Sequence, residues 1–154
     1  MRGTEALLTM LEERGVDTIF GYPGGSVLSI YNELLDSDIR HVLVRHEQCA
    51  AHMADGYARA KNVPGGCLAT SGPGTTNLVT GIATAYADSV PLIALTGQVA
   101  AGSLGQGAFQ EVDAYSLLMP ITKHSYRVLD VNRLPHAISE AWDICQMGRK
   151  GPVH

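Results

Sequence analysis

Short apolar runs alternate with longer amphipathic segments along the whole chain. The apolar runs predict strands over 18–20, 41–44, 66–70 and 92–96, with a further strand near 125–128. The amphipathic segments predict helices over 4–14, 26–35, 47–61, 75–87 and 134–147, and a short helix near 113–118. Residues 148–154 resemble a turn that enters another strand.

The last predicted helix shows its buried face clearly. Leu134, Ile138, Ala141, Trp142 and Cys145 fall at i, i+4, i+7, i+8 and i+11, which places them on one stripe. Such a stripe is typical of a helix that packs on a sheet.

Strands that alternate with helices indicate a parallel sheet covered on both faces and joined by right-handed crossovers. We therefore predict one doubly wound α/β domain over residues 1–154. Ser26 is expected to cap the helix that follows the first strand. The chain stops near the start of its last predicted strand, so we expect it to be a fragment or a domain separated from a longer polypeptide.

Composition narrows the classes of function. The net charge is −4 and no run of Lys or Arg occurs, which argues against a nucleic-acid surface. No apolar stretch approaches the roughly 18 residues of a membrane span. Cys49, Cys67 and Cys145 are far apart and in apolar settings, so we expect reduced core thiols in a cytoplasmic protein.

Histidines raise the question of a metal site. His46 and Glu47 resemble the start of H-E-x-x-H, but Ala50 stands where the second histidine would be. His52 lies six residues after His46, on a different side of a helix. We therefore expect no metal ligands from this chain alone.

Three Gly-rich turns, 21–25, 71–74 and 97–107, follow three of the predicted strands. The carboxyl ends of parallel strands meet at one edge of the sheet, where α/β domains open their ligand crevice. None of the turns matches a phosphate-binding fingerprint, so they suit a flat, mostly apolar ligand better than a polyphosphate. The alternative is that Gly and Pro serve only to form the turns.

Two further positions at this edge suggest chemistry. Glu47 follows a strand and begins a helix, so it is either a functional carboxylate or an ordinary partner of the helix dipole. Phe109 and Gln110 end the longest loop, where Phe could wall an apolar pocket and Gln could position a carboxylate or carbonyl group. Alternatively, they simply begin the next helix.

Taken together, these runs resemble the N-terminal pyrimidine-binding domain of acetohydroxyacid (acetolactate) synthase large subunits, a family of thiamine-diphosphate enzymes. The similarity extends in order over essentially the whole chain. The runs that resemble the family are Phe-Gly-Tyr-Pro-Gly-Gly at 20–25, Arg-His-Glu-Gln through Gly-Tyr-Ala-Arg at 45–59, Thr-Ser-Gly-Pro-Gly-Thr-Thr-Asn at 70–77, Thr-Gly-Gln-Val at 96–99 and Ala-Phe-Gln-Glu at 108–111.

The resemblance implies a role for each of these site residues. Glu47 would hydrogen-bond N1′ of the cofactor's aminopyrimidine, and Gln110 would be the second catalytic residue. Gly25, Phe109 and Gln110 would lie beside the 2-keto acid substrate. The residues that the family places around the cofactor are Tyr22, Pro23, Gly24, Glu47, Pro73 and Asn77.

The implied activity is that of a transferase in branched-chain amino-acid biosynthesis. It decarboxylates pyruvate and condenses the two-carbon unit with a second 2-keto acid. The family's GDG…NN motif for Mg²⁺ and diphosphate is absent, as is the middle domain that holds most contacts to FAD. We therefore expect this chain alone to be inactive, with Mg²⁺ and FAD bound mainly outside it.

The same resemblance implies partners. We expect a homodimer through the cofactor edge, with the small-residue helices 47–61 and 75–87 forming an exposed apolar patch. A diphosphate-binding domain, elsewhere on the chain or on a separate subunit, would complete the site, and a small regulatory subunit is a further partner to test for.

Ala100 and Gly107 stand where the family usually has Pro and often has Asp. These two departures affect the rigidity of the long loop. Two alternatives remain open: the α-subunit of a split keto-acid decarboxylase, and a non-catalytic interaction module with the same fold. The preference for the second keto acid and any feedback regulation are also open.

Overall fold

The computed structural model describes residues 2–154, and its strands form one parallel sheet. The strand order across the sheet is β2–β1–β3–β4–β5. The strands are β1 (Thr18–Gly21), β2 (Arg40–Leu43), β3 (Gly65–Ala69), β4 (Leu92–Thr96) and β5 (Pro152–Val153). The chain places β2 on one side of β1 and then β3, β4 and β5 on the other side, with all strands parallel. This order confirms the doubly wound α/β prediction.

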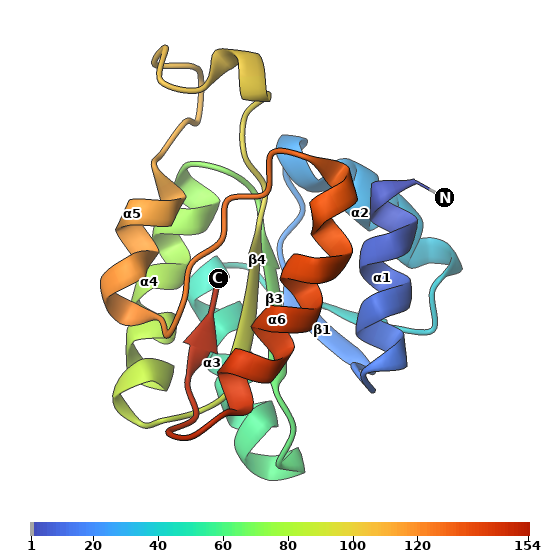
Figure 1. Ribbon diagram of the computed structural model, residues 1–154, viewed down its shortest axis with the longest axis vertical. Helices are drawn as coiled ribbons and strands as arrows, with labels where there is room; N and C mark the ends of the chain where they lie inside the picture. Colours follow the sequence, from blue (N-terminus) through green and yellow to red (C-terminus); the bar gives the residue numbers. More distant parts are fainter. Residues whose placement is uncertain (1) are drawn as a thin grey trace.

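Helices cover both faces of the sheet (Figure 1). One face carries α1 (Gly3–Glu13), α2 (Leu28–Glu33) and α6 (Leu134–Gln146). The other face carries α3 (Glu47–Lys61), α4 (Pro73–Ala87) and α5 (Ala114–Leu118). The buried stripe predicted for the last helix is confirmed, because Ile138, Ala141 and Cys145 of α6 are buried.

The segment after β1 differs from the prediction of one capped helix over 26–35. It forms a 3₁₀ turn at Gly25–Val27, then α2, then a second 3₁₀ turn at Leu34–Asp36. Ser26 lies inside the first turn and does not cap α2. The physical reason is that its hydroxyl is engaged by a neighbouring turn, at Thr70 and Ser71.

Residues 125–128 do not form the expected strand, although the strand predicted after residue 148 does form, as β5. Lys123 N donates to Pro152 O at 2.8 Å and Tyr126 N donates to His154 O at 2.7 Å, which is the start of a parallel ladder. The ladder amounts to a single bridge, between His124 and Val153. A single bridge is too short to make this segment a strand.

The small residues of α3 and α4 face each other within the chain. Ala51 has no exposed surface, and a Cβ built on Gly81 would lie 2.4 Å from the Cβ of Ala51. The expectation that these small residues form an exposed patch is therefore wrong at Ala51. Small side chains let the two helices approach closely, so the surface of these side chains is buried between the helices.

The cysteines divide into two groups. Cys67 and Cys145 are buried, and burial raises the pKa of each thiol to about 12. Cys49 is exposed, so the expectation of a core thiol is wrong there. The reason is that position 49 falls on the outer side of α3, away from its buried alanines. Among residues 2–154, the structure contains no helix that is both long and apolar enough to cross a membrane.

Candidate functional site

The Gly-rich turns after β1, β3 and β4 converge at the carboxyl edge of the sheet. A Cβ added to Gly24 would lie 2.5 Å from the Cβ of Thr70. A Cβ added to Gly97 would lie 2.0 Å from Oγ of Ser26. Only glycine permits such approaches, so these two glycines have a packing role beyond forming turns.

A hydroxyl network ties these turns together. Oγ of Ser26 and Oγ1 of Thr70 share a hydrogen bond of 2.9 Å, and the backbone N–H of Ser71 donates to Ser26 Oγ at 2.9 Å. Sequence reasoning missed this role, because it assigned Ser26 to a helix cap. The available signal was the pair of hydroxyl residues at 70 and 71, placed just before a Gly-Pro turn.

Glu47 and Asn77 meet at the centre of this edge. Glu47 is the first residue of α3, and only 9% of it is exposed. Nδ2 of Asn77 donates to Oε2 of Glu47 at 2.9 Å, across 30 positions of sequence. Both interpretations of Glu47 are compatible with this geometry, since a carboxylate at a helix N-terminus also interacts favourably with the dipole.

The second oxygen of Glu47 is left available. Oε1 accepts no hydrogen bond from residues 2–154, and it is not among the fully enclosed polar atoms without a partner. A nearly buried carboxyl group with one bonded and one free oxygen is suited to a nitrogen-containing ring, because a free polar atom in such a place gains most from a hydrogen-bond partner.

Pro73 and Gln110 are brought to the same turn. Pro73 is the first residue of α4, directly after Gly72, whose φ is +57°. A Cβ on Gly72 would lie 2.5 Å from the carbonyl oxygen of Gln110. The backbone of Gln110, at φ +58°, therefore packs against the turn that leads to Pro73.

The other expected site residues lie at the surface of this edge. Tyr22 is 41% exposed, and its backbone N–H donates to Leu68 O at 3.3 Å. Pro23 and Gly25 are exposed beside it. Phe109 is 88% exposed, so the structure does not bring its ring into a packed pocket with Glu47.

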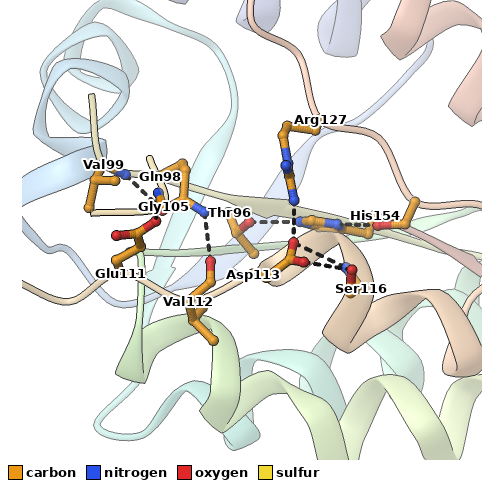
Figure 2. Close-up of polar contacts among 11 residues, drawn as sticks. Thr96, Gln98, Val99, Gly105, Glu111, Val112, Asp113, Ser116, Arg127 and His154 are labelled. Atoms are coloured by element: carbon orange, nitrogen blue, oxygen red, sulfur yellow. Dashed lines mark hydrogen bonds and ion pairs between the residues drawn. The ribbon is translucent and has the colours of Figure 1, made fainter. Parts of the chain in front are cut away.

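The long loop after β4 has its own polar contacts (Figure 2). Nε2 of Gln98 donates to Val112 O, and Oε1 of Gln98 accepts from Val99 N, both at 2.8 Å. Glu111 accepts from the N–H groups of Gly105 and Ala108. These bonds hold the pKa of the Glu111 carboxyl below its usual range.

A cavity of about 650 Å³ lies away from Glu47, on the face covered by α1 and α6. Leu7, Leu95 and Ile138 are among its lining residues, and neither Glu47 nor Asn77 is. This cavity is therefore separate from the Glu47–Asn77 site. Within residues 2–154 no group of three or more His, Cys, Asp or Glu side chains could hold a metal ion.

Comparison with known proteins agrees with this geometry. The family described as "Thiamine pyrophosphate enzyme, N-terminal TPP binding domain" matches residues 1–117. The chain is 57% identical over all its 154 residues to the probable acetolactate synthase large subunit of Methanocaldococcus jannaschii, covering 26% of that protein. It is 50% identical over 153 residues, or 99% of the chain, to the acetolactate synthase isozyme 2 large subunit of Escherichia coli, covering 28% of that protein.

The acetolactate synthase of Arthrospira platensis is 56% identical over 155 aligned positions, which include 98% of this chain and 27% of that protein. The chain thus spans about a quarter of the length of the curated relatives it matches. On the match over residues 1–117, the chain belongs to the family of N-terminal TPP-binding domains of thiamine pyrophosphate enzymes.

Proposed function

We propose that this chain supplies the pyrimidine-binding half of the active site of an acetolactate synthase. The complete enzyme would decarboxylate pyruvate and condense the two-carbon unit with a second 2-keto acid. The observation that supports this most directly is the pairing of Glu47 with Asn77, which leaves one carboxyl oxygen free at the carboxyl edge of the sheet. The identity to acetolactate synthases over the whole chain supports the choice within the family.

The residues present fit thiamine diphosphate at its aminopyrimidine end. Oε1 of Glu47 would hydrogen-bond a ring nitrogen, while the hydrogen bond from Asn77 to Oε2 would orient the carboxyl group. When bound, thiamine diphosphate would supply the nucleophilic carbon that the reaction requires. Tyr22, Pro23 and Gly24 would flank this ring on one side and Pro73 on the other.

Glu47 would handle the proton that the reaction requires. Its carboxyl group is largely shielded from water, so proton transfer to or from a bound ring does not compete with solvent. Gln110 and Phe109 would lie beside the substrate, and Gly25 would leave room for it, since a Cβ there would meet nothing within 4 Å.

The rest of the site would come from outside this chain. Mg²⁺ usually binds through carboxylates and phosphates, so we assign it, with the diphosphate, to a separate diphosphate-binding domain. FAD, where present, would also bind mainly outside this chain. We further propose a cytoplasmic location, consistent with three cysteines that form no disulfide in the structure.

A homodimer at the cofactor edge remains part of the proposal. The buried position of Ala51 removes the small-residue patch as its basis, but Tyr22 and Phe109 at this edge are exposed apolar side chains. We expect light scattering to give the mass of a dimer, and Phe109→Arg to weaken the association. A monomer at high micromolar concentration would contradict the interface.

The experiment that tests the function uses Glu47→Gln in the complete enzyme. The exchange of the cofactor's C2 proton, followed by NMR, should slow by about 10²–10⁴-fold because the variant loses the carboxyl group that handles the proton. Glu13→Gln, at an exposed position of α1, is a control that should leave the rate unchanged. An exchange rate for Glu47→Gln within about threefold of the unmodified enzyme would remove Glu47 from this role.

A further inference from the structure

Phe109 and Gln110 lie at the C-terminal end of a loop whose residues are all exposed or partly exposed. Phe109 is 88% exposed, so its position depends on the backbone on either side. That backbone contains Gly105 at φ +78° and Gly107 at φ +68°. Glycines at such angles leave a loop many conformations unless another contact restricts it.

Glu111 provides that contact. One oxygen of its carboxylate accepts the N–H of Gly105, and the other accepts the N–H of Ala108 at 3.0 Å. Its own backbone N–H donates to Ala108 O at 3.0 Å. The side chain thereby closes the segment Gly105–Glu111 into a ring, which we call the Glu111 ring.

The Glu111 ring is separate from the other charged contacts nearby. Asp113 pairs with Arg127 and accepts from Ser116, and neither group bonds Glu111 (Figure 2). Bonds from backbone N–H groups to a carboxylate are stronger than neutral ones, so one side chain can restrict this short segment.

The ring determines where Gln110 lies. Gln110 has φ +58°, an angle that an ordinary residue adopts only where its surroundings enforce it. Its carbonyl group packs against Gly72, one residue before Pro73. The Glu111 ring on one side and Gly72 on the other thus hold the end of the loop at the edge where Glu47 lies.

We propose that Glu111 is a positioning residue for the 2-keto acid substrate, acting through the backbone of Phe109 and Gln110. This inference rests on the proposed function, because it assigns those two residues to the substrate. A positioning role differs from a general structural role in the part of the site that loss of the side chain leaves unchanged. Loss of Glu111 disorders the substrate side of the site and leaves the Glu47–Asn77 pair intact.

The first test uses this chain without any cofactor. Glu111→Gln keeps the size of the side chain and removes the charge, so amide hydrogen exchange at Gly105 and Ala108 should speed up by roughly tenfold. Glu13→Gln, at an exposed position of α1, is the matched control and should leave these amides unchanged. Unchanged amide hydrogen exchange in Glu111→Gln would show that Glu111 does not hold this segment, and would overturn the proposal.

The second test measures the complete enzyme. For Glu111→Gln, kcat/KM for the keto acid should fall by about tenfold to a hundredfold, because small displacements of positioning groups have effects of this size. The C2 proton exchange of the cofactor should stay unchanged, and Glu111→Asp should recover part of the loss. A fall in both rates would indicate a merely structural role and overturn the proposal, as would an unchanged kcat/KM. An unmodified enzyme that consumes no 2-keto acid would instead refute the proposed function.

Discussion

The pair Glu47–Asn77 and the loop Gly97–Gln110 are organised in opposite ways. The pair is nearly buried and joins side chains 30 positions apart. The side-chain hydrogen bonds of the loop join residues at most 14 positions apart, and its most prominent side chain, Phe109, is exposed. The fold therefore fixes the pair, whereas the loop is held mainly by its own sequence.

This difference suits the two tasks that we propose. A cofactor that stays bound benefits from a rigid, pre-oriented carboxyl group. Substrates must enter and leave, so the residues beside them gain from a loop that can move without disturbing the core.

The largest expected difference between the two regions is their response to added bulk. Gly81→Ala, between the two helices that carry Glu47 and Asn77, should lower the free energy of unfolding by about 1–3 kcal/mol, because its Cβ would lie 2.4 Å from the Cβ of Ala51. Gly102→Ala should change it by less than about 1 kcal/mol, since nothing lies within 4 Å of that position. Thermal and urea unfolding measure both free energies. Equal losses in the two variants would contradict the difference between the pair and the loop.

Much of this contrast could be predicted from the sequence. The bounds of α3 and β4 follow from apolar periodicity, and the motif at 45–59 identified Glu47. The hydroxyl network at Ser26 could not be predicted, because it forms only when two turns far apart in sequence meet. Similarly, the single bridge between His124 and Val153 depends on a partner that is not a sequence neighbour, and local propensity does not report that.

A smaller effect, on cofactor affinity, is expected when the hydrogen bond between Asn77 and Glu47 is removed. Asn77→Leu has nearly the same volume and leaves Oε2 of Glu47 without its donor. Because hydrogen bonds to charged groups contribute about 1.5–3 kcal/mol, cofactor affinity in the complete enzyme should fall by roughly tenfold. Asn32→Leu, at an exposed position of α2, is the matched control. Calorimetry that finds equal affinity in Asn77→Leu and the unmodified enzyme would show that Asn77 does not orient Glu47.

The central claim is that this chain binds the aminopyrimidine end of the cofactor and not its diphosphate. The most direct measurement is an NMR titration of the chain with thiamine and, separately, with thiamine diphosphate and Mg²⁺. We predict similar dissociation constants for both, weaker than about 100 μM, with the side-chain amide signals of Asn77 shifting in each case. Glu47→Gln should abolish the shift. Much tighter binding of the diphosphate form, or shifts confined to the cavity under α1 and α6, would contradict the claim.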